Sequence, residues 1–298
     1  MLTYNPCRLC PRECRTDRSK VTGFCGCGDK IKVARAAIHY WEEPCISGKN
    51  GSGTVFFSGC TLGCCYCQNQ KISAEAYGKE ITTLRLSEIF LELQEKGAHN
   101  INLVTATQFL PGVIEALGYV KNKLHIPVVY NCGGYEKAET IKALEGYADI
   151  YLPDIKYFSG GLSLRYSGAA DYFTIACKAV KEMIAQTGDL VYDSDGILKK
   201  GVIIRHLVLP GCRKDSFEIL RWISSNLPPE KYMLSLMSQY TPFPVRSKDY
   251  PELNRKVTSF EYDSVVSEAL RLGISCGYIQ ERSSAKEEYT PPFDLEGV

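Results

Sequence analysis

The stretch TVFFSGCTLGCCYCQN, residues 54–69, joins an apolar run to a loop that is rich in cysteine. TVFFSG predicts a short buried strand, because it is apolar, rich in β-branched and aromatic residues, and ends in Ser-Gly. The loop then places Cys60, Cys64 and Cys67 in a C-x3-C-x2-C spacing, with Cys65 between them. Three thiolates this close together can hold three irons of a [4Fe-4S] cluster and leave the fourth iron open to another ligand.

Two other interpretations of this loop stay open from the residues alone. A structural zinc site prefers four ligands in a closed tetrahedron, and Cys65 is the available fourth thiol. The thiols can also be buried and without a metal. We expect the iron–sulfur cluster, because the neighbours of Cys65 already crowd the loop.

Beyond the loop, apolar runs alternate with helical patterns along the chain. We expect strands at 54–59, 101–106, 126–131, 148–153, 201–210, 232–238 and 275–280, and helices near 85–97, after Pro111, and at 136–146, 171–186, 215–226 and 261–272. The strands are continuous apolar runs, which is typical of a parallel sheet covered on both faces.

The predicted fold is therefore α/β, a partial parallel barrel of the (β/α)6 type with a cysteine-rich N-terminal extension. A doubly wound open sheet is the alternative. In both folds ligands bind at the carboxyl ends of the strands. We expect two parts, an N-terminal metal-binding segment at 1–50 and the barrel at 51–298, and a surface loop in the proline-rich stretch 241–253.

Composition limits the kind of protein. The 298 residues are 45% apolar, and 35 Lys and Arg against 34 Asp and Glu give a net charge of +1, which disfavours nucleic acid as a partner. The N-terminus lacks the apolar run of a signal peptide, and no stretch has the length of a membrane span. We expect a cytoplasmic protein without a membrane partner, whose 14 cysteines serve metals or catalysis rather than disulfides.

A second group of cysteines lies near the N-terminus. Cys7, Cys10, Cys14 and Cys25 form a C-x2-C-x3-C-x10-C pattern on a polar segment, and Cys27 is a competing ligand. Four thiols suit a closed metal site, for which zinc and a second iron–sulfur cluster both fit the ligand chemistry. The absence of any metal here is the remaining alternative.

The pattern C-x3-C-x-aromatic-C, with Tyr66 as the aromatic residue, resembles the signature of the radical S-adenosylmethionine (SAM) superfamily. That resemblance implies a [4Fe-4S] cluster whose open iron binds SAM. It also implies reductive cleavage of SAM to a 5′-deoxyadenosyl radical that removes a hydrogen atom from a substrate. Cys65 is then no ligand, and Tyr66 lies against the adenine.

The resemblance extends along most of the chain. Segments such as CRLCPREC, VARAAIHYWEEPCISG, VVYNCGGYE, YLPDIKY, RHLVLPG and SLMSQYTP are similar to PflX-type proteins, which are relatives of the pyruvate formate-lyase activating enzyme. Several motifs agree at once, so the family likeness is specific.

The likeness also implies residues of a SAM pocket. Asp154 and Lys156 resemble the D-x-K motif of the activating enzymes, for which the alternative is an ordinary surface ion pair. Arg205 lies in a strand that otherwise reads as buried, where an arginine needs a partner. Asn131, followed by Gly133 and Gly134, resembles the strand end near the ribose, although a plain strand-to-helix turn is also possible. His206 is expected to point to the other face and to be structural.

One departure from the activating enzymes concerns their G-G-E stretch, which binds the SAM amino group. The corresponding segment here is VTATQF, so Thr105 and Thr107 are the candidates to offer hydroxyls and carbonyls instead.

We expect an oxidoreductase that abstracts hydrogen from a protein or peptide and receives electrons from a reductase, flavodoxin or ferredoxin. The alternatives are a radical SAM enzyme acting on a small molecule or RNA, and a non-catalytic iron–sulfur electron carrier.

Overall fold

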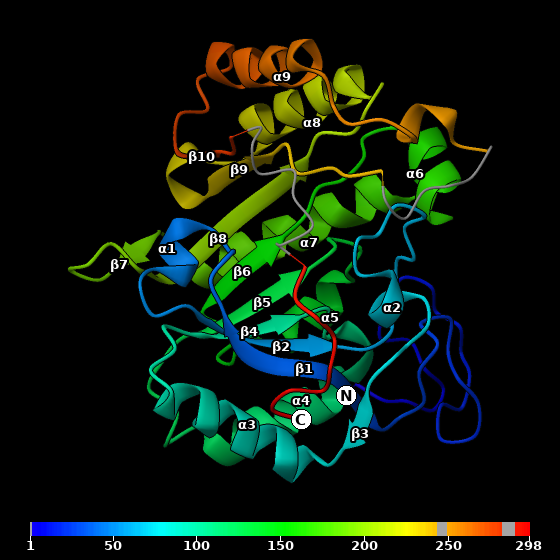
Figure 1. Cartoon of the computed structure of the whole chain (residues 1–298), viewed down its shortest axis with the longest axis vertical. Helices are drawn as coiled ribbons and strands as arrows, with labels where there is room; N and C mark the ends of the chain where they lie inside the picture. The colour runs from blue at the N-terminus through cyan, green and yellow to red at the C-terminus, as the bar shows by residue number, and fades with distance from the viewer. Residues whose placement is uncertain (1, 243–248, 282–289) are drawn as a thin grey trace.

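A computed structural model of the chain describes residues 2–242, 249–281 and 290–298 (Figure 1). One sheet organises them, with the strand order β10-β9-β8-β6-β5-β4-β2-β1-β3. Residues 243–248 of the predicted proline-rich loop lie outside the described residues. No helix in the described ranges is both long enough and apolar enough to cross a membrane.

From β2 to β10 every neighbouring pair in this order is parallel. These strands are β2 (Ser52–Phe57), β4 (Ile101–Val104), β5 (Val128–Cys132), β6 (Ile150–Pro153), β8 (Leu198–Leu207), β9 (Met233–Met237) and β10 (Gly277–Ile279). Each overlaps a predicted strand. All residues of β2, β4, β5 and β6 are buried, as expected for strands that are covered on both faces.

The helices that connect the strands confirm the α/β alternation. They are α3 (Thr83–Glu95), α4 (Leu110–Val120), α5 (Ala138–Lys142), α7 (Tyr172–Thr187), α8 (Arg213–Asn226) and α9 (Ser259–Arg271). In α3 the predicted apolar face, Leu86, Ile89, Phe90 and Leu93, is buried. Three further short helices, α1 (Pro44–Ser47), α2 (Gln70–Ser73) and α6 (Gly160–Ser167), were not predicted.

The antiparallel strands were not predicted. β1 (Ile31–His39) pairs with β2 and with β3 (Lys79–Ile81), and β7 (Val191–Tyr192) pairs with β8. β1 intersperses charged residues among apolar ones, so it lacks the continuous apolar run by which the parallel strands were predicted. Since β1 lies within the predicted N-terminal segment 1–50, the two predicted parts of the chain share one sheet.

From β2 to β10 the parallel strands lie side by side in chain order, without the reversal of a doubly wound sheet, and within the described residues the sheet does not close. The predicted partial barrel is therefore confirmed. The end of the chain runs along β1, where Ala36 N donates to Glu296 O over 2.8 Å and Arg35 pairs with Asp294 at 2.7 Å. Figure 1 shows this red C-terminal segment crossing in front of the sheet.

The cysteine-rich N-terminus packs against the loop that follows β2. Arg12 donates to the Thr61 carbonyl over 3.0 Å and to the Leu62 carbonyl over 2.9 Å. Gly59 marks the closest approach, with φ of +79°, a conformation that favours glycine. A Cβ atom at this position would lie 2.4 Å from both the Cys25 carbonyl oxygen and Cys27 Sγ.

We therefore expect Gly59→Ala to destabilise the protein by more than the strain of a positive φ, which costs about 1–2 kcal/mol for alanine. Gly97→Ala is the matched control, because Gly97 has φ of +83° and nothing within 4 Å of its Cβ position. Thermal unfolding of anaerobically purified protein measures both. Equal losses of stability in the two variants would show that the N-terminal segment does not pack closely against this loop at Gly59.

Candidate active site

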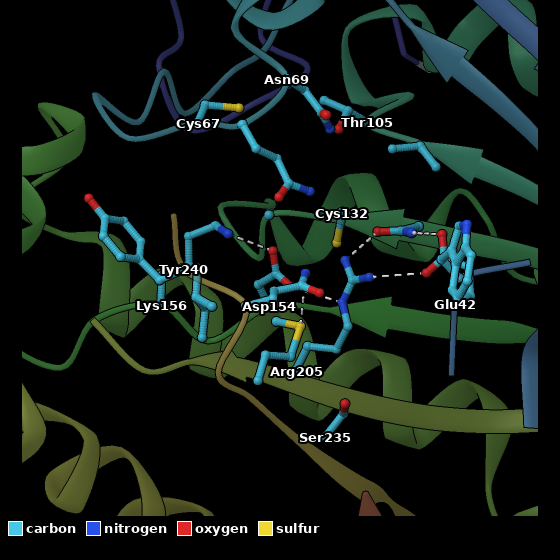
Figure 2. Close-up of a pocket in the computed structure, with 18 of the residues that line it drawn as sticks. Glu42, Cys67, Asn69, Thr105, Cys132, Asp154, Lys156, Arg205, Ser235 and Tyr240 are labelled. Carbon is cyan, nitrogen blue, oxygen red and sulfur yellow. Dashed lines mark hydrogen bonds and ion pairs between the residues drawn. The ribbon is translucent and has the colours of Figure 1, made fainter. Parts of the chain in front are cut away.

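A cavity of about 420 Å³ lies on the inner side of the sheet, within the size range of small-molecule sites. It is lined from strands across the sheet, from Phe56 on β2 to Ile279 on β10. Figure 2 shows Cys67 and Thr105 on one side and the charged residues Asp154, Arg205 and Glu42 away from them. A concave face shared by so many strands is what the predicted barrel requires.

The loop after β2 brings its predicted ligands to this cavity. Cys60, Cys64 and Cys67 all line it, whereas Cys65 does not. The loop is fixed from behind by Gln108, whose buried side-chain amide donates to the carbonyls of Ser58 (2.8 Å), Gly59 (3.1 Å) and Thr105 (2.8 Å). Gln108 was not among the predicted site residues, because a buried amide carries no local signal in the sequence.

These thiols lie where a negative charge is costly. Burial, together with repulsion from Cys64 and Cys67, raises the pKa of Cys60 to about 12. Burial and Cys64 likewise raise the pKa of Cys67. Three thiolates here need cations beside them, as the irons of a cluster would be. In the described part of the chain no three Cys, His, Asp or Glu side chains converge on one point closely enough to hold a single metal ion.

Tyr66 lines the cavity and is almost fully buried. Its ring meets those of Tyr157, Tyr166 and Tyr240 edge to face, with centroids 6.3, 6.2 and 6.1 Å away. Aromatic packing of this kind holds the ring in place. The predicted contact between Tyr66 and an adenine stays a prediction, for which the ring is placed suitably.

The predicted pocket residues Asp154, Lys156, Arg205 and Asn131 lie together on the cavity. Lys156 Nζ lies 2.6 Å from Asp154 Oδ2, and Arg205 Nε lies 2.9 Å from Asp154 Oδ1. Arg205 also donates to Asn131 Oδ1 over 2.6 Å. Asp154 and Lys156 thus do not form the exposed ion pair that was the alternative, because their side chains are only 11% and 17% exposed.

Burial alone would make every charge in this network costly. Burial alone would raise the pKa of Asp154. The neighbouring cations Arg205 and Lys156 have the larger effect, so the pKa of Asp154 lies below its ordinary value. Burial disfavours the charged forms of Lys156 and Arg205 too, but Asp154 raises the pKa of each. The network therefore stays ionised and presents two cations to the cavity.

Two carboxylates that the sequence analysis missed complete the network. Glu42 and Glu43 lie between β1 and α1 and line the cavity. Glu42 Oε2 lies 3.3 Å from Arg205 Nη1, and its Oε1 accepts from Asn102 Nδ2 over 2.9 Å. Glu43 is 8% exposed, and its Oε2 has no hydrogen-bond partner. Burial raises the pKa of both carboxyl groups. The sequence feature that could have indicated these site residues is the pair of acids directly before Pro44.

The two threonines that were the candidates to replace the G-G-E stretch lie in different places. Thr105 lines the cavity with φ of +58°, an unusual conformation for a β-branched residue that costs of order 1–3 kcal/mol. Thr107 is buried outside the cavity, where its hydroxyl donates to Glu136 Oε1 over 2.7 Å. Thr105 is thus the threonine that a ligand in the cavity would meet.

The glycines and the histidine nearby have separate roles. Gly133 lines the cavity, whereas Gly134 packs strand ends, since a Cβ atom there would lie 2.0 Å from the Asp154 carbonyl oxygen. His206 is buried, with Nδ1 2.6 Å from the Ile155 carbonyl oxygen and Nε2 2.8 Å from Ser216 Oγ. His206 is structural, as expected.

The N-terminal cysteines gather away from the cavity. Cys7, Cys10 and Cys25 are buried and Cys14 is half-buried, as free thiols. The competing ligand Cys27 donates its thiol hydrogen to the Ser58 carbonyl over 3.3 Å.

The chain is similar to known proteins. Residues 54–185 match the family model of the radical SAM superfamily, so the predicted membership of that superfamily is confirmed for this part of the chain. An uncharacterized protein of Methanocaldococcus jannaschii is 29% identical over 287 residues, which are 92% of this chain and 77% of that protein.

Two solved structures are similar to part of this chain. Methylornithine synthase gives a TM-score of 0.46 at 18% identity, over 72% of this chain and 58% of that one. Streptococcus suis SuiB bound to its precursor peptide SuiA gives 0.46 at 11% identity, over 71% of this chain and 43% of that one. This chain therefore spans about half the length of these proteins.

The ion network gives a stability prediction. Arg205→Met leaves the carboxylate of Glu42 buried without its cation and Asp154 with only Lys156, so we expect a loss of about 3 kcal/mol or more in the free energy of unfolding. Urea denaturation measures this loss. Arg221→Met is the control, because that half-exposed arginine pairs on the surface and its loss should cost at most about 1 kcal/mol. Equal costs would contradict the buried network.

The buried acid outside the cavity gives a pH prediction. Burial raises the pKa of Glu136 to about 8, from 4.5, so the folded chain holds this proton more tightly than the unfolded chain. The stability that Glu136 contributes is therefore complete below about pH 4.5 and is lost as the pH rises toward 8. We expect Glu136→Gln to gain a few kcal/mol relative to wild type over this range, at about 1.4 kcal/mol per pKa unit.

Unfolding curves at several pH values test this expectation. Glu95→Gln is the control, since it makes the same change of charge at an exposed position of α3. A stability difference between wild type and Glu136→Gln that is constant with pH would show that Glu136 titrates normally.

Proposed function

We propose that this chain, whose residues 54–185 belong to the radical SAM superfamily, removes a hydrogen atom from a protein or peptide substrate. Membership of the superfamily implies a [4Fe-4S] cluster, SAM and radical catalysis. The closer relation to PflX-type proteins and to activating enzymes of glycyl-radical enzymes rests on sequence motifs and is part of the proposal. So is a cytoplasmic location, which the 14 unpaired cysteines support.

The residues on the cavity suit the two cofactors. Cys60, Cys64 and Cys67 would hold the cluster, and Lys156 and Arg205 supply the positive charge that a SAM carboxylate needs. A cluster held there would supply the one-electron reduction that cleavage of SAM requires.

The chain's own residues orient the pocket and shield it from water. The Tyr172 hydroxyl accepts from Lys156 N over 3.0 Å and donates to the Gly133 carbonyl over 2.8 Å, which fixes the ends of β5 and β6 around the pocket. Tyr66 and its ring partners form an apolar wall beside the cysteine loop. Such a wall excludes water, which protects a reactive radical from side reactions.

One observation supports a large substrate. Trp41, after β1, and Ile279, on β10, both line the cavity although their side chains are 56% and 55% exposed. Large apolar side chains that reach from a cavity to solvent suit a partner that covers them. They lie toward opposite ends of the sheet order, so a protein loop or peptide that covers both would also cover the cavity between them.

A second candidate is a small substrate that carries a positive charge. The unpartnered, buried carboxylate oxygen of Glu43 favours it, because such an oxygen gains most from a cationic hydrogen-bond donor. The third alternative, a non-catalytic electron carrier, has no use for the ionised Asp154–Lys156–Arg205 network on the cavity.

The first test is catalytic. Anaerobic protein reconstituted with iron and sulfide, then given SAM and dithionite, should release 5′-deoxyadenosine, and Cys64→Ala should release none. Cys276→Ala is the matched control, because Cys276 is exposed and does not line the cavity. Redox cycling of the cluster without any cleavage of SAM, with or without cell extract, would favour the electron carrier.

The second test separates the substrate classes. Extract from cells grown in heavy water is divided by dialysis, and each fraction is added to the reaction. Deuterium in 5′-deoxyadenosine with the retained, macromolecular fraction is the expected result. Deuterium only with the dialysable fraction would overturn the protein or peptide substrate in favour of the small molecule.

A further inference from the structure

The cysteines at the N-terminus face one another across a short, buried segment. A Cβ atom at Gly23 would lie 3.4 Å from Cys14 Sγ and 3.5 Å from Cys25 Sγ, so these two thiols approach the same point. The backbone around Cys7 is fixed by hydrogen bonds to Thr16 and Arg15, both of 2.9 Å. This gathering of thiols is thus ordered by the segment's own main chain.

A buried cation lies among these thiols. Arg18 is 2% exposed, and its Nη1 lies 3.8 Å from Cys7 Sγ. Its guanidinium also donates to the carbonyls of Gln108 (2.5 Å) and Cys27 (3.2 Å), and in the described ranges it forms no ion pair with a carboxylate. A buried guanidinium without a counter-charge is costly. A centre of several thiolates with a net negative charge would supply that counter-charge.

The thiol group touches the cysteine loop of the cavity directly. Cys27 donates to the Ser58 carbonyl over 3.3 Å, and Cys25 and Cys27 enclose Gly59, the residue before Cys60. Gln108 also connects Arg18 to Ser58. The carbonyl of Gln108 accepts from the Arg18 guanidinium, and its side-chain amide donates to the Ser58 carbonyl. Few atoms therefore separate the two sets of cysteines.

From these contacts we propose that Cys7, Cys10, Cys14 and Cys25 hold a second [4Fe-4S] cluster, which passes electrons to the cluster at Cys60, Cys64 and Cys67. An outside one-electron donor reduces the second cluster from the 2+ to the 1+ state. That cluster returns to 2+ when it gives the electron to the first. This role rests on the proposed function, because it supplies the electron that SAM cleavage consumes.

Zinc fits the same four thiols less well. Zinc cannot change its oxidation state, so it would gain nothing from contact with the other cysteine loop. Cys27 is left out of the ligand set because its thiol serves the Ser58 carbonyl.

The surface of the segment suits an acidic electron donor. Apart from the buried Arg18, residues 2–30 contain five Lys and Arg against three Asp and Glu, while the whole chain is nearly neutral. Arg15 and Lys20 have side chains that are 65% and 79% exposed, and Cys14 is the half-buried ligand. Complementary charge of this kind guides a partner to the side from which an electron would enter.

The metal content tests the site without any catalysis. After anaerobic reconstitution, a variant with Cys60, Cys64 and Cys67 changed to Ala should retain about four irons and four sulfides per chain. Once reduced, it should give an EPR signal that SAM does not alter, since four thiolates leave no open iron. Zinc in place of iron, or no metal at all, in this variant would overturn the second cluster.

The electron-transfer role needs a separate readout. With a purified flavodoxin hydroquinone as donor, rapid-freeze EPR follows the reduction of the cluster at Cys60, Cys64 and Cys67. We expect Cys10→Ala to slow this reduction at least tenfold, while dithionite reduces that cluster as in wild type. Cys14→Ser, at the half-buried ligand, gives the same readout if Cys10→Ala fails to fold. Cys276→Ala should change nothing.

A wild-type rate of reduction by flavodoxin in the Cys10 and Cys14 variants would overturn the relay. This result is independent of 5′-deoxyadenosine and of the substrate, so it is distinguishable from a failure of the proposed function.

Discussion

The cavity is organised around one largely buried cation, the guanidinium of Arg205. Its partners come from separate parts of the chain: Asp154 follows β6, Asn131 lies near the end of β5, and Glu42 follows β1. Because an isolated buried guanidinium is unstable, these elements must meet for the barrel to form. Buried ion pairs are rarely the most stable way to fill a core, so their presence on a cavity fits a role in binding a charged ligand.

The opposite side of the cavity depends on polar contacts of another kind. Gln108 gathers three main-chain carbonyls beneath the cysteine loop, and Gly59 lets the N-terminal segment reach that loop. The loop is therefore supported by residues from the N-terminus and from the region after β4. Thiols held in this way stay at the rim of an ordered cavity, facing the cations of the ion network.

Continuous apolar runs were sufficient to predict the parallel strands, because only strands covered on both faces have that pattern. The cysteine spacing and the DIK and RHLVLPG segments likewise led to residues that meet on the cavity. β1 was not predicted because charged residues interrupt its apolar pattern. Glu42 and Glu43, which follow β1, were therefore not predicted as site residues either. Gln108 and the buried Arg18 act through contacts between distant segments, which no local pattern reveals.

The proposed function depends on three cysteines that leave one iron open and on SAM binding at that iron. Electron–nuclear double resonance on the reduced protein, with SAM labelled with nitrogen-15 at its amino group, measures this binding. We expect a nitrogen-15 coupling to the cluster that is lost in Cys64→Ala. A cluster whose EPR signal forms fully but shows no change and no coupling with SAM would contradict it.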